Sequence, residues 1–206
     1  MDLRSHLALW VSTAMLAACS TTPPAHSGFL QDYSALKPDK YGKKALLWTE
    51  KSGFDWKRYK AVMLDPVVIY YHPSAGSRAI QPVEAQKLAL YFREAVVAEL
   101  KGTYPVITIP GPDVLRIRTA ITDVVAASPA VNIVTTAVAF VPLDMGGASI
   151  EVEFLDSITG EQLAAMVESK KGSPLNIPGG FTELGHARAA FREWAVELKS
   201  ALQTGP

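Results

Sequence analysis

Hydrophobic and polar positions alternate along much of the second half of the chain, which is the pattern of β-strands that bury one face. The alternation predicts strands at residues 113–125, 149–155 and 161–169. Asp, Thr and Gly occur in the intervening residues 156–160 and are typical of a tight turn. The last two strands should therefore form a hairpin.

Two other segments repeat hydrophobic residues every three or four positions, which is the spacing of an amphipathic helix. The first should begin near Pro82, since proline fits a first helical turn, and should end at Gly102. The second closes the chain, with an apolar stripe from Ala187 to Leu202. We expect both helices to pack on the same face of the sheet.

Three further apolar runs are less regular. Residues 61–71 are rich in β-forming side chains, but Pro66 favours an edge or bulged strand. Residues 104–109 indicate a short strand, and a strand, helix, strand order favours a right-handed crossover onto a parallel neighbour. Residues 131–141 are apolar and β-branched, so they could form a strand or a helix lying on the sheet.

These elements predict an α+β fold: a single mixed, mostly antiparallel sheet with two amphipathic helices packed on one face. The chain has 206 residues, which fits one domain over residues 28–206 after an N-terminal leader and tether. Residues 28–36 carry too many apolar side chains for a linker. We expect them to dock on the domain.

Aromatic residues are concentrated before the first predicted strand. Between residues 43 and 59, aromatics alternate with charged residues; they are Trp48, Phe54, Trp56 and Tyr59. Such side chains could line a ligand surface, or they could pin irregular segments to a core. We favour the second interpretation.

The alternation also places charges on the strand faces that point away from the core. Glu151 and Glu153 share one face of their strand, and Arg116 and Arg118 share one face of theirs. If these strands are neighbours, the glutamates should face the arginines as exposed ion pairs, each contributing at most about 1 kcal/mol. Such pairs would influence the strand order more than the stability.

The composition narrows the possible partners. Lys and Arg together number 20, as do Asp and Glu, so the chain is neutral and no nucleic-acid partner is expected. The only cysteine is Cys19, so the domain must be held by packing without an internal disulfide. An unpaired thiol is unusual in a secreted protein, and attachment of lipid would remove it.

The N-terminus has the features of an export signal over residues 1–18. Arg4 lies near the start, an apolar run of about ten residues follows from Leu7, and small residues come next. That run is about half as long as a membrane-spanning helix requires. Residues 19–27 are small, polar and rich in proline, which suits a flexible tether.

The end of this signal, Leu16-Ala17-Ala18-Cys19, resembles the lipobox of bacterial lipoproteins. The resemblance implies that Cys19 becomes the first mature residue and carries a diacylglyceryl thioether and an N-acyl chain such as palmitate. By the same resemblance, Ser20 implies sorting to the outer membrane. Membrane lipid is then the expected partner of Cys19, since two or more acyl chains hold a protein on a bilayer.

Candidate catalytic chemistry is sparse. The mature chain contains His26, His72 and His186, but it has no Gly-x-Ser-x-Gly nucleophile elbow and no zinc ligands at helical spacing. We expect no catalytic residues, no metal and no cofactor besides the covalent lipid. The alternative is an envelope hydrolase that uses a histidine and a carboxylate in the loop of His72 or of His186.

Several short motifs follow one another in a recognisable order. They are Ser27-Gly28-Phe29-Leu30, Asp113-Val114-Leu115-Arg116-Ile117, Gly146-Gly147-Ala148 and Thr159-Gly160-Glu161. Together with the lipobox they resemble domain-of-unknown-function family 3313 of Gram-negative lipoproteins, over nearly the whole mature chain. The resemblance implies a periplasm-facing lipoprotein and no established catalytic residues.

The sequence therefore predicts a protein that is anchored by lipid in the outer membrane and faces the periplasm. We expect it to act as a non-catalytic binding or accessory module of the Gram-negative envelope. Its partner would be another envelope protein, or a small apolar or glycan ligand.

Overall fold

The computed structural model describes most of the region that the sequence assigns to the domain. The described residues are 26–38, 46–73, 80–130, 132, 146–173, 175 and 182–204. The predicted signal peptide and Cys19 lie outside them. The predicted segment 131–141 also lies outside them, except for Asn132. This residue is in a helical turn, and its amide donates to the Ser128 carbonyl, 3.1 Å away.

The described residues form one mixed sheet of seven strands. Its strands are β1 (Lys37–Pro38), β2 (Leu46–Glu50), β3 (Ala61–Leu64), β4 (Val68–Ile69), β5 (Val114–Val125), β6 (Gly147–Asp156) and β7 (Gln162–Lys171). Their order across the sheet is β1-β2-β7-β6-β5-β3, and β4 also pairs with β5. Only β3 and β4 run parallel to β5, so the sheet is mostly antiparallel, as predicted.

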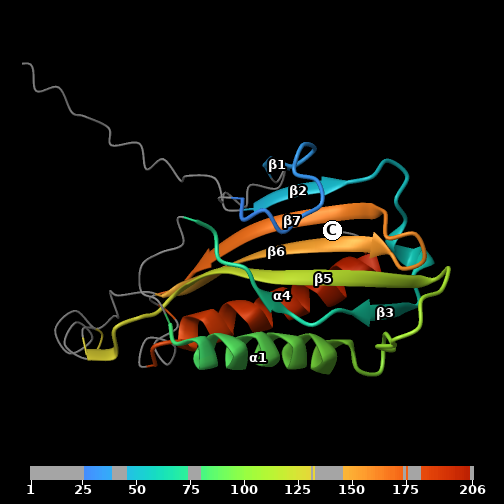
Figure 1. Cartoon of the computed structure of the whole chain (residues 1–206). Coiled ribbons are helices and arrows are strands. Elements are labelled where there is room, and N and C mark those ends of the chain that lie inside the picture. Colours follow the sequence, from blue (N-terminus) through green and yellow to red (C-terminus); the bar gives the residue numbers. More distant parts are fainter. Residues whose placement is uncertain are drawn as a thin grey trace, which may run out of the picture.

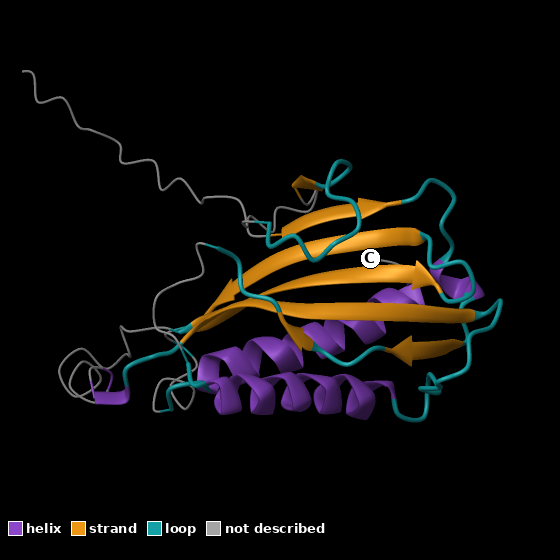
Figure 2. Ribbon diagram, viewed as in Figure 1, coloured by secondary structure: helices purple, strands orange, loops and turns teal. Residues whose placement is uncertain are grey.

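Both predicted helices are present, as α1 (Pro82–Leu100) and α4 (Gly185–Thr204). They lie side by side on one face of the sheet (Figure 2), where the rings of Phe92 and Phe191 stack with centroids 4.7 Å apart. Gly102 follows α1 with a φ of 79°, a left-handed conformation that glycine adopts without strain and that ends the helix. The predicted start and end of this helix are confirmed.

The β6–β7 hairpin is also confirmed, because its turn residues satisfy their own backbone. The Asp156 carboxylate accepts hydrogen bonds from the amides of Ile158, at 3.0 Å, and Thr159, at 2.8 Å. On the strands, Ile117 of β5 is paired with Phe154 of β6, and both are buried toward the helices. The alternating pattern thus gave the correct core face for both strands.

Two local predictions are wrong. Residues 46–50 were expected to be irregular but form β2, because β7 offers a long partner strand that local sequence does not reveal. Residues 104–109 were expected to be a strand, yet only Val106 makes an isolated bridge, to Val62. Pro105 has no amide to donate, and the Tyr104 amide instead donates to the last turn of α1 at Leu100, 2.9 Å away.

The parallel crossover therefore joins β3 and β4 through α1 to β5. Pro66 lies between these two short strands, which replace the single edge or bulged strand expected over residues 61–71. The main core lies between the sheet and the helix pair. Its most deeply buried large side chains include Leu88, Leu115 and Phe191. Neither of the long described helices combines the length and hydropathy needed to cross a membrane.

Candidate ligand-binding site

The residues of the predicted lipobox, Leu16, Ala17, Ala18 and Cys19, and the predicted sorting residue Ser20 lie outside the described residues. The structure therefore does not bear on the anchor. It does place both histidines of the alternative hydrolase prediction.

His72 and His186 belong to different parts of the fold. The His72 amide donates to the Thr122 carbonyl, 2.9 Å away, beyond the end of β4. His186 lies in the first turn of α4, is 2% exposed and packs against Gly172, so burial lowers the pKa of its imidazole. Neither nitrogen of the His186 ring has a hydrogen-bond partner among the described residues.

Within the described ranges, no three His, Cys, Asp or Glu side chains are grouped so that they could hold a metal ion. Two other features stand out from the surrounding structure. One is a covered pair of glutamates on the outer face of the sheet, and the other is a cavity on the helix face.

The outer face of the sheet is covered by residues 27–36, which we call the strap. Figure 1 shows this blue segment crossing the face opposite the helices. The Ser27 amide and hydroxyl donate to the two carboxylate oxygens of Glu151, at 2.6 and 2.8 Å, and the Tyr33 hydroxyl also donates to Glu151. Leu30 is buried against β7 at Ala165 and Val167. The predicted docking of residues 28–36 is confirmed.

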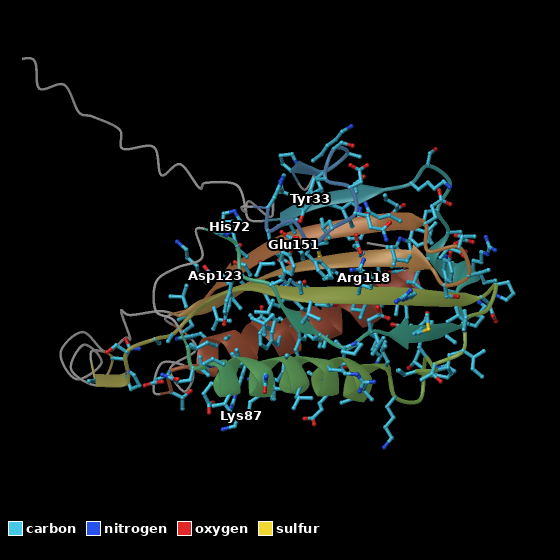
Figure 3. All side chains as sticks on the ribbon, in the orientation of Figure 1. Tyr33, His72, Lys87, Arg118, Asp123 and Glu151 are labelled. Atoms are coloured by element: carbon cyan, nitrogen blue, oxygen red, sulfur yellow. The ribbon has the colours of Figure 1, made fainter. Side chains whose placement is uncertain are left out.

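A second carboxylate is held beside the first. Glu153 accepts a hydrogen bond from the Gln31 amide of the strap and forms an ion pair with Arg118 of β5. Figure 3 shows Arg118, Glu151 and Tyr33 on this face of the sheet. The Arg118 guanidinium also lies 4.9 Å from the centroid of the Phe29 ring, so the strap covers the ion pair with an aromatic side chain.

Burial changes the electrostatics of this pair. The side chains of Glu151 and Glu153 are both 0% exposed. Loss of hydration raises the pKa of Glu153, while the Gln31 amide and Arg118 act in the opposite direction. The strap therefore uses carboxylates as acceptors for its own backbone, which is a charge-assisted and directional form of docking.

Of the predicted ion pairs between the arginines of β5 and the glutamates of β6, one is present, and its glutamate is buried instead of exposed. Arg118 faces Glu153, but Arg116 makes a bidentate pair with Asp65, at 3.0 and 2.7 Å, and Glu151 is bound by the strap. The glutamates are buried because the strap excludes water. Ser27 and Glu151 are 124 positions apart, so the strand pattern alone gives no sign of this covering.

The opposite face of the sheet carries a cavity of about 1040 Å³ beneath the helices. Six strand positions at about 4.8 Å make a sheet about 29 Å wide, whereas two helices of about 10 Å diameter cover only about 20 Å. Part of the cavity lining comes from β2, β7 and the neighbouring α4. Side chains that line the cavity there include Trp48, Met166, Trp194, Leu198 and Ala201.

Residues from both edges of the sheet line this cavity. Lys37 and Trp48 contribute from the β1–β2 edge, and Leu64 and Val67 contribute from the β3–β4 edge. Between these edges the lining is mainly apolar, with side chains such as Val152. The lining therefore reaches across the sheet from one edge to the other.

Two carboxylates of the cavity wall, Glu168 and Glu197, have partners close by. The Trp194 indole donates to the buried Glu168 carboxylate, 2.6 Å away. Lys170 approaches Glu197 at 2.9 Å and Glu168 at 3.9 Å. Because these charges are paired, this part of the cavity wall offers a ligand mainly apolar surface together with two carboxylates.

The sequence contains partial signals for this cavity. Trp48 does line it, which matches the interpretation that we did not favour, whereas Trp56 and Tyr59 are buried in the core as we expected. Glu168 gave no signal, because it lies on a predicted strand whose glutamate would ordinarily face water. The cavity depends on how helices and sheet fit together, and periodicity does not report that.

The solved structures that resemble the chain include the following three, all at TM-scores below 0.5, and these likenesses carry no argument about function. The PelC dodecamer from Paraburkholderia phytofirmans has a TM-score of 0.47 at 11% identity and covers 77% of this chain and 96% of its own. A DUF330 protein from Xanthomonas campestris has a TM-score of 0.41 at 13% identity, and the alignment covers 76% of this chain and 91% of that protein. A DUF4136 protein from Bacteroides thetaiotaomicron has a TM-score of 0.35 at 11% identity, and the alignment covers 78% of this chain and 97% of that protein.

The comparison with curated proteins finds no match. The family model described as "Protein of unknown function (DUF3313)" matches residues 25–198, which include the strap, all seven strands and most of α4. The chain therefore belongs to the DUF3313 family, in agreement with the resemblance stated from its motifs.

Proposed function

We propose that this protein is a lipid-anchored module of the Gram-negative outer membrane that faces the periplasm and binds an elongated apolar ligand without chemical conversion. The observation that carries the ligand part is the cavity of about 1040 Å³ between the sheet and the helices. The anchor part is supported by the sequence at Cys19 and the residues before it.

The size and lining of the cavity fit an acyl chain or a similar flexible hydrocarbon. Ligand pockets commonly enclose about 300–1,000 Å³ and are mostly apolar with a few polar groups that fix orientation. A chain that buried about 300 Å² of apolar surface would gain about 7 kcal/mol before the entropic costs of binding. Binding at 1 μM corresponds to about 8.2 kcal/mol, so this gain alone does not give micromolar affinity, and further burial or contacts to a polar headgroup must add to it.

The paired charges near Lys170 would orient such a ligand. Lys170 bridges Glu168 and Glu197, and it also lies 5.4 Å from the centroid of the Trp194 ring. A polar headgroup could exchange with these partners while the hydrocarbon extends beneath the helices. The expected ligand therefore has one polar end and one long apolar part.

A substitution that fills the cavity tests this proposal. Leu198 lines the cavity on α4, and Val196, two residues earlier on the same helix, is 51% exposed and outside the lining. We expect Leu198→Trp to weaken binding of a fluorescent C16 fatty acid by at least about tenfold, because the indole occupies the apolar volume. Val196→Trp should bind the probe as the unaltered protein does.

Binding would be followed by the emission of the probe in a titration of the full chain, with thermal melts to confirm that both variants are folded. Saturable binding that is lost only in Leu198→Trp supports the cavity. Equal affinity of the two variants, or a lack of saturable binding to the unaltered chain, would rule the cavity out as an acyl-chain site.

A further inference from the structure

Exposed apolar side chains gather at one end of the sheet. Val68, Tyr70 and Tyr71 are 40%, 46% and 42% exposed, and they come from β4 and the two residues after it. The Tyr70 amide donates to the Ile121 carbonyl of β5, 2.9 Å away, so the backbone of this edge is fixed to the sheet. A fixed and exposed apolar edge usually has a partner.

This edge adjoins the start of the strap. A Cβ atom placed on Gly28 would lie 4.0 Å from the ring and hydroxyl of Tyr70, and the Phe29 and Tyr70 ring centroids are 6.1 Å apart. Gly28 is nine residues after Cys19 in the sequence. A fully extended chain of nine residues spans at most about 32 Å, so an anchored protein would keep this edge within that distance of the bilayer.

We propose that residues 68–71 are a second membrane contact, which rests in the lipid headgroup region and holds the anchored domain end-on. The inference depends on the lipid anchor of the proposed function but not on the cavity. Tyrosine suits this place, because its ring is apolar and its hydroxyl remains hydrated at the membrane interface. A short tether also raises the local concentration of lipid, so a weak contact is sufficient.

The opposite end of the sheet should remain in water. The Tyr70 amide is hydrogen-bonded to the Ile121 carbonyl, and Ile121 is the β5 partner of Ile150, near the start of β6. The six residue-to-residue steps from Ile150 to Asp156 advance about 20 Å at about 3.4 Å each, and the turn with Ile158 lies beyond them. Interfacial side chains enter a bilayer by only about 5–10 Å, so Ile158, although 62% exposed, would not reach it.

Single-cysteine labelling can locate the bilayer. In the lipidated full-length protein the Cys19 thiol is consumed by the thioether, so an introduced cysteine is the only reactive thiol. We would place an environment-sensitive dye at Tyr71→Cys, or at Val68→Cys as a second site, and at Ile158→Cys as the matched control. Each labelled protein would be reconstituted into phosphatidylethanolamine and phosphatidylglycerol vesicles, with Cys19→Ser as the unanchored reference.

We expect the lipidated proteins to float with the vesicles. Brominated lipid should quench the dye at position 71 or 68 at least about twofold more than the dye at position 158, because only that end lies in the headgroup region. Flotation with equal quenching at both ends would overturn the membrane contact and leave the anchor intact. Failure to float would overturn anchor and contact together, and dye shielding that requires added envelope protein would assign this edge to a protein partner instead.

Discussion

One hydroxyl group, that of Tyr33, takes part in three hydrogen bonds of the strap, which makes Tyr33→Phe a sharp test of how the outer face is closed. The Tyr33 hydroxyl donates to Glu151 and accepts from the amides of Gly28, at 2.8 Å, and Leu30, at 3.1 Å. The substitution removes these three interactions and leaves the ring in place. Glu151, which is fully buried, then keeps only its two bonds from Ser27.

The expected loss can be worked from these contacts. A hydrogen bond to a charged group contributes about 1.5–3 kcal/mol, and the amide of the exposed Gly28 can bind water instead of the lost hydroxyl. We therefore expect Tyr33→Phe to lower the free energy of unfolding by about 2 kcal/mol. For a domain of this size, that corresponds to a decrease in Tm of about 4–8 °C.

The assay is chemical unfolding by urea, followed by circular dichroism, together with a thermal melt. Tyr71→Phe is the matched control, since Tyr71 is 42% exposed and its change should stay within about 0.5 kcal/mol. If Tyr33→Phe is no more destabilising than this control, the hydroxyl does not hold the strap and the docking must be attributed to apolar contacts such as Leu30.

Two further predictions concern buried charge. Arg118→Met should lower the free energy of unfolding by about 3 kcal/mol, because it leaves the buried Glu153 carboxylate without its cationic partner. Arg116→Met, the control, should lower it by only about 1 kcal/mol, because its partner Asp65 is partly exposed. Similar losses for the two variants in urea unfolding would refute the distinction. His186 has a lowered pKa in the folded state, so the unfolded chain binds the proton more readily: its contribution to stability is complete above pH 6.5 and is lost as the pH falls below that value. His186→Leu should remove this dependence between pH 7.5 and 5.5, and unfolding curves with an unchanged pH slope would show that another group is responsible.

The parts of the fold that follow from short-range pattern were predictable. The β6–β7 hairpin, β5 and both helices have periodicity and turn residues within their own segments, and each lies where the sequence placed it. The β2 strand could not be found in this way. Its five residues carry a weak pattern, and they become a strand because the edge of β7 was available for pairing.

The candidate sites were less predictable because they depend on relations between distant segments. Glu151 and Glu153 looked like solvated or paired surface charges, and only the strap, more than a hundred residues earlier, makes them buried. The cavity is a consequence of how much of the sheet the helices leave uncovered. No residue type marks such a space, although Trp48 indicated one of its walls.

The strap also has a consequence for the order in which the chain can fold. It contains the first described residues of the domain, yet its acceptors on β6 and its apolar partners on β7 are more than a hundred positions later. Contacts of such long sequence separation form late, since the intervening chain must first be ordered. The first segment of the domain to be synthesised is therefore expected to be the last to dock, and until it does, the sheet presents Glu151 and Glu153 to water, although both are buried in the folded protein.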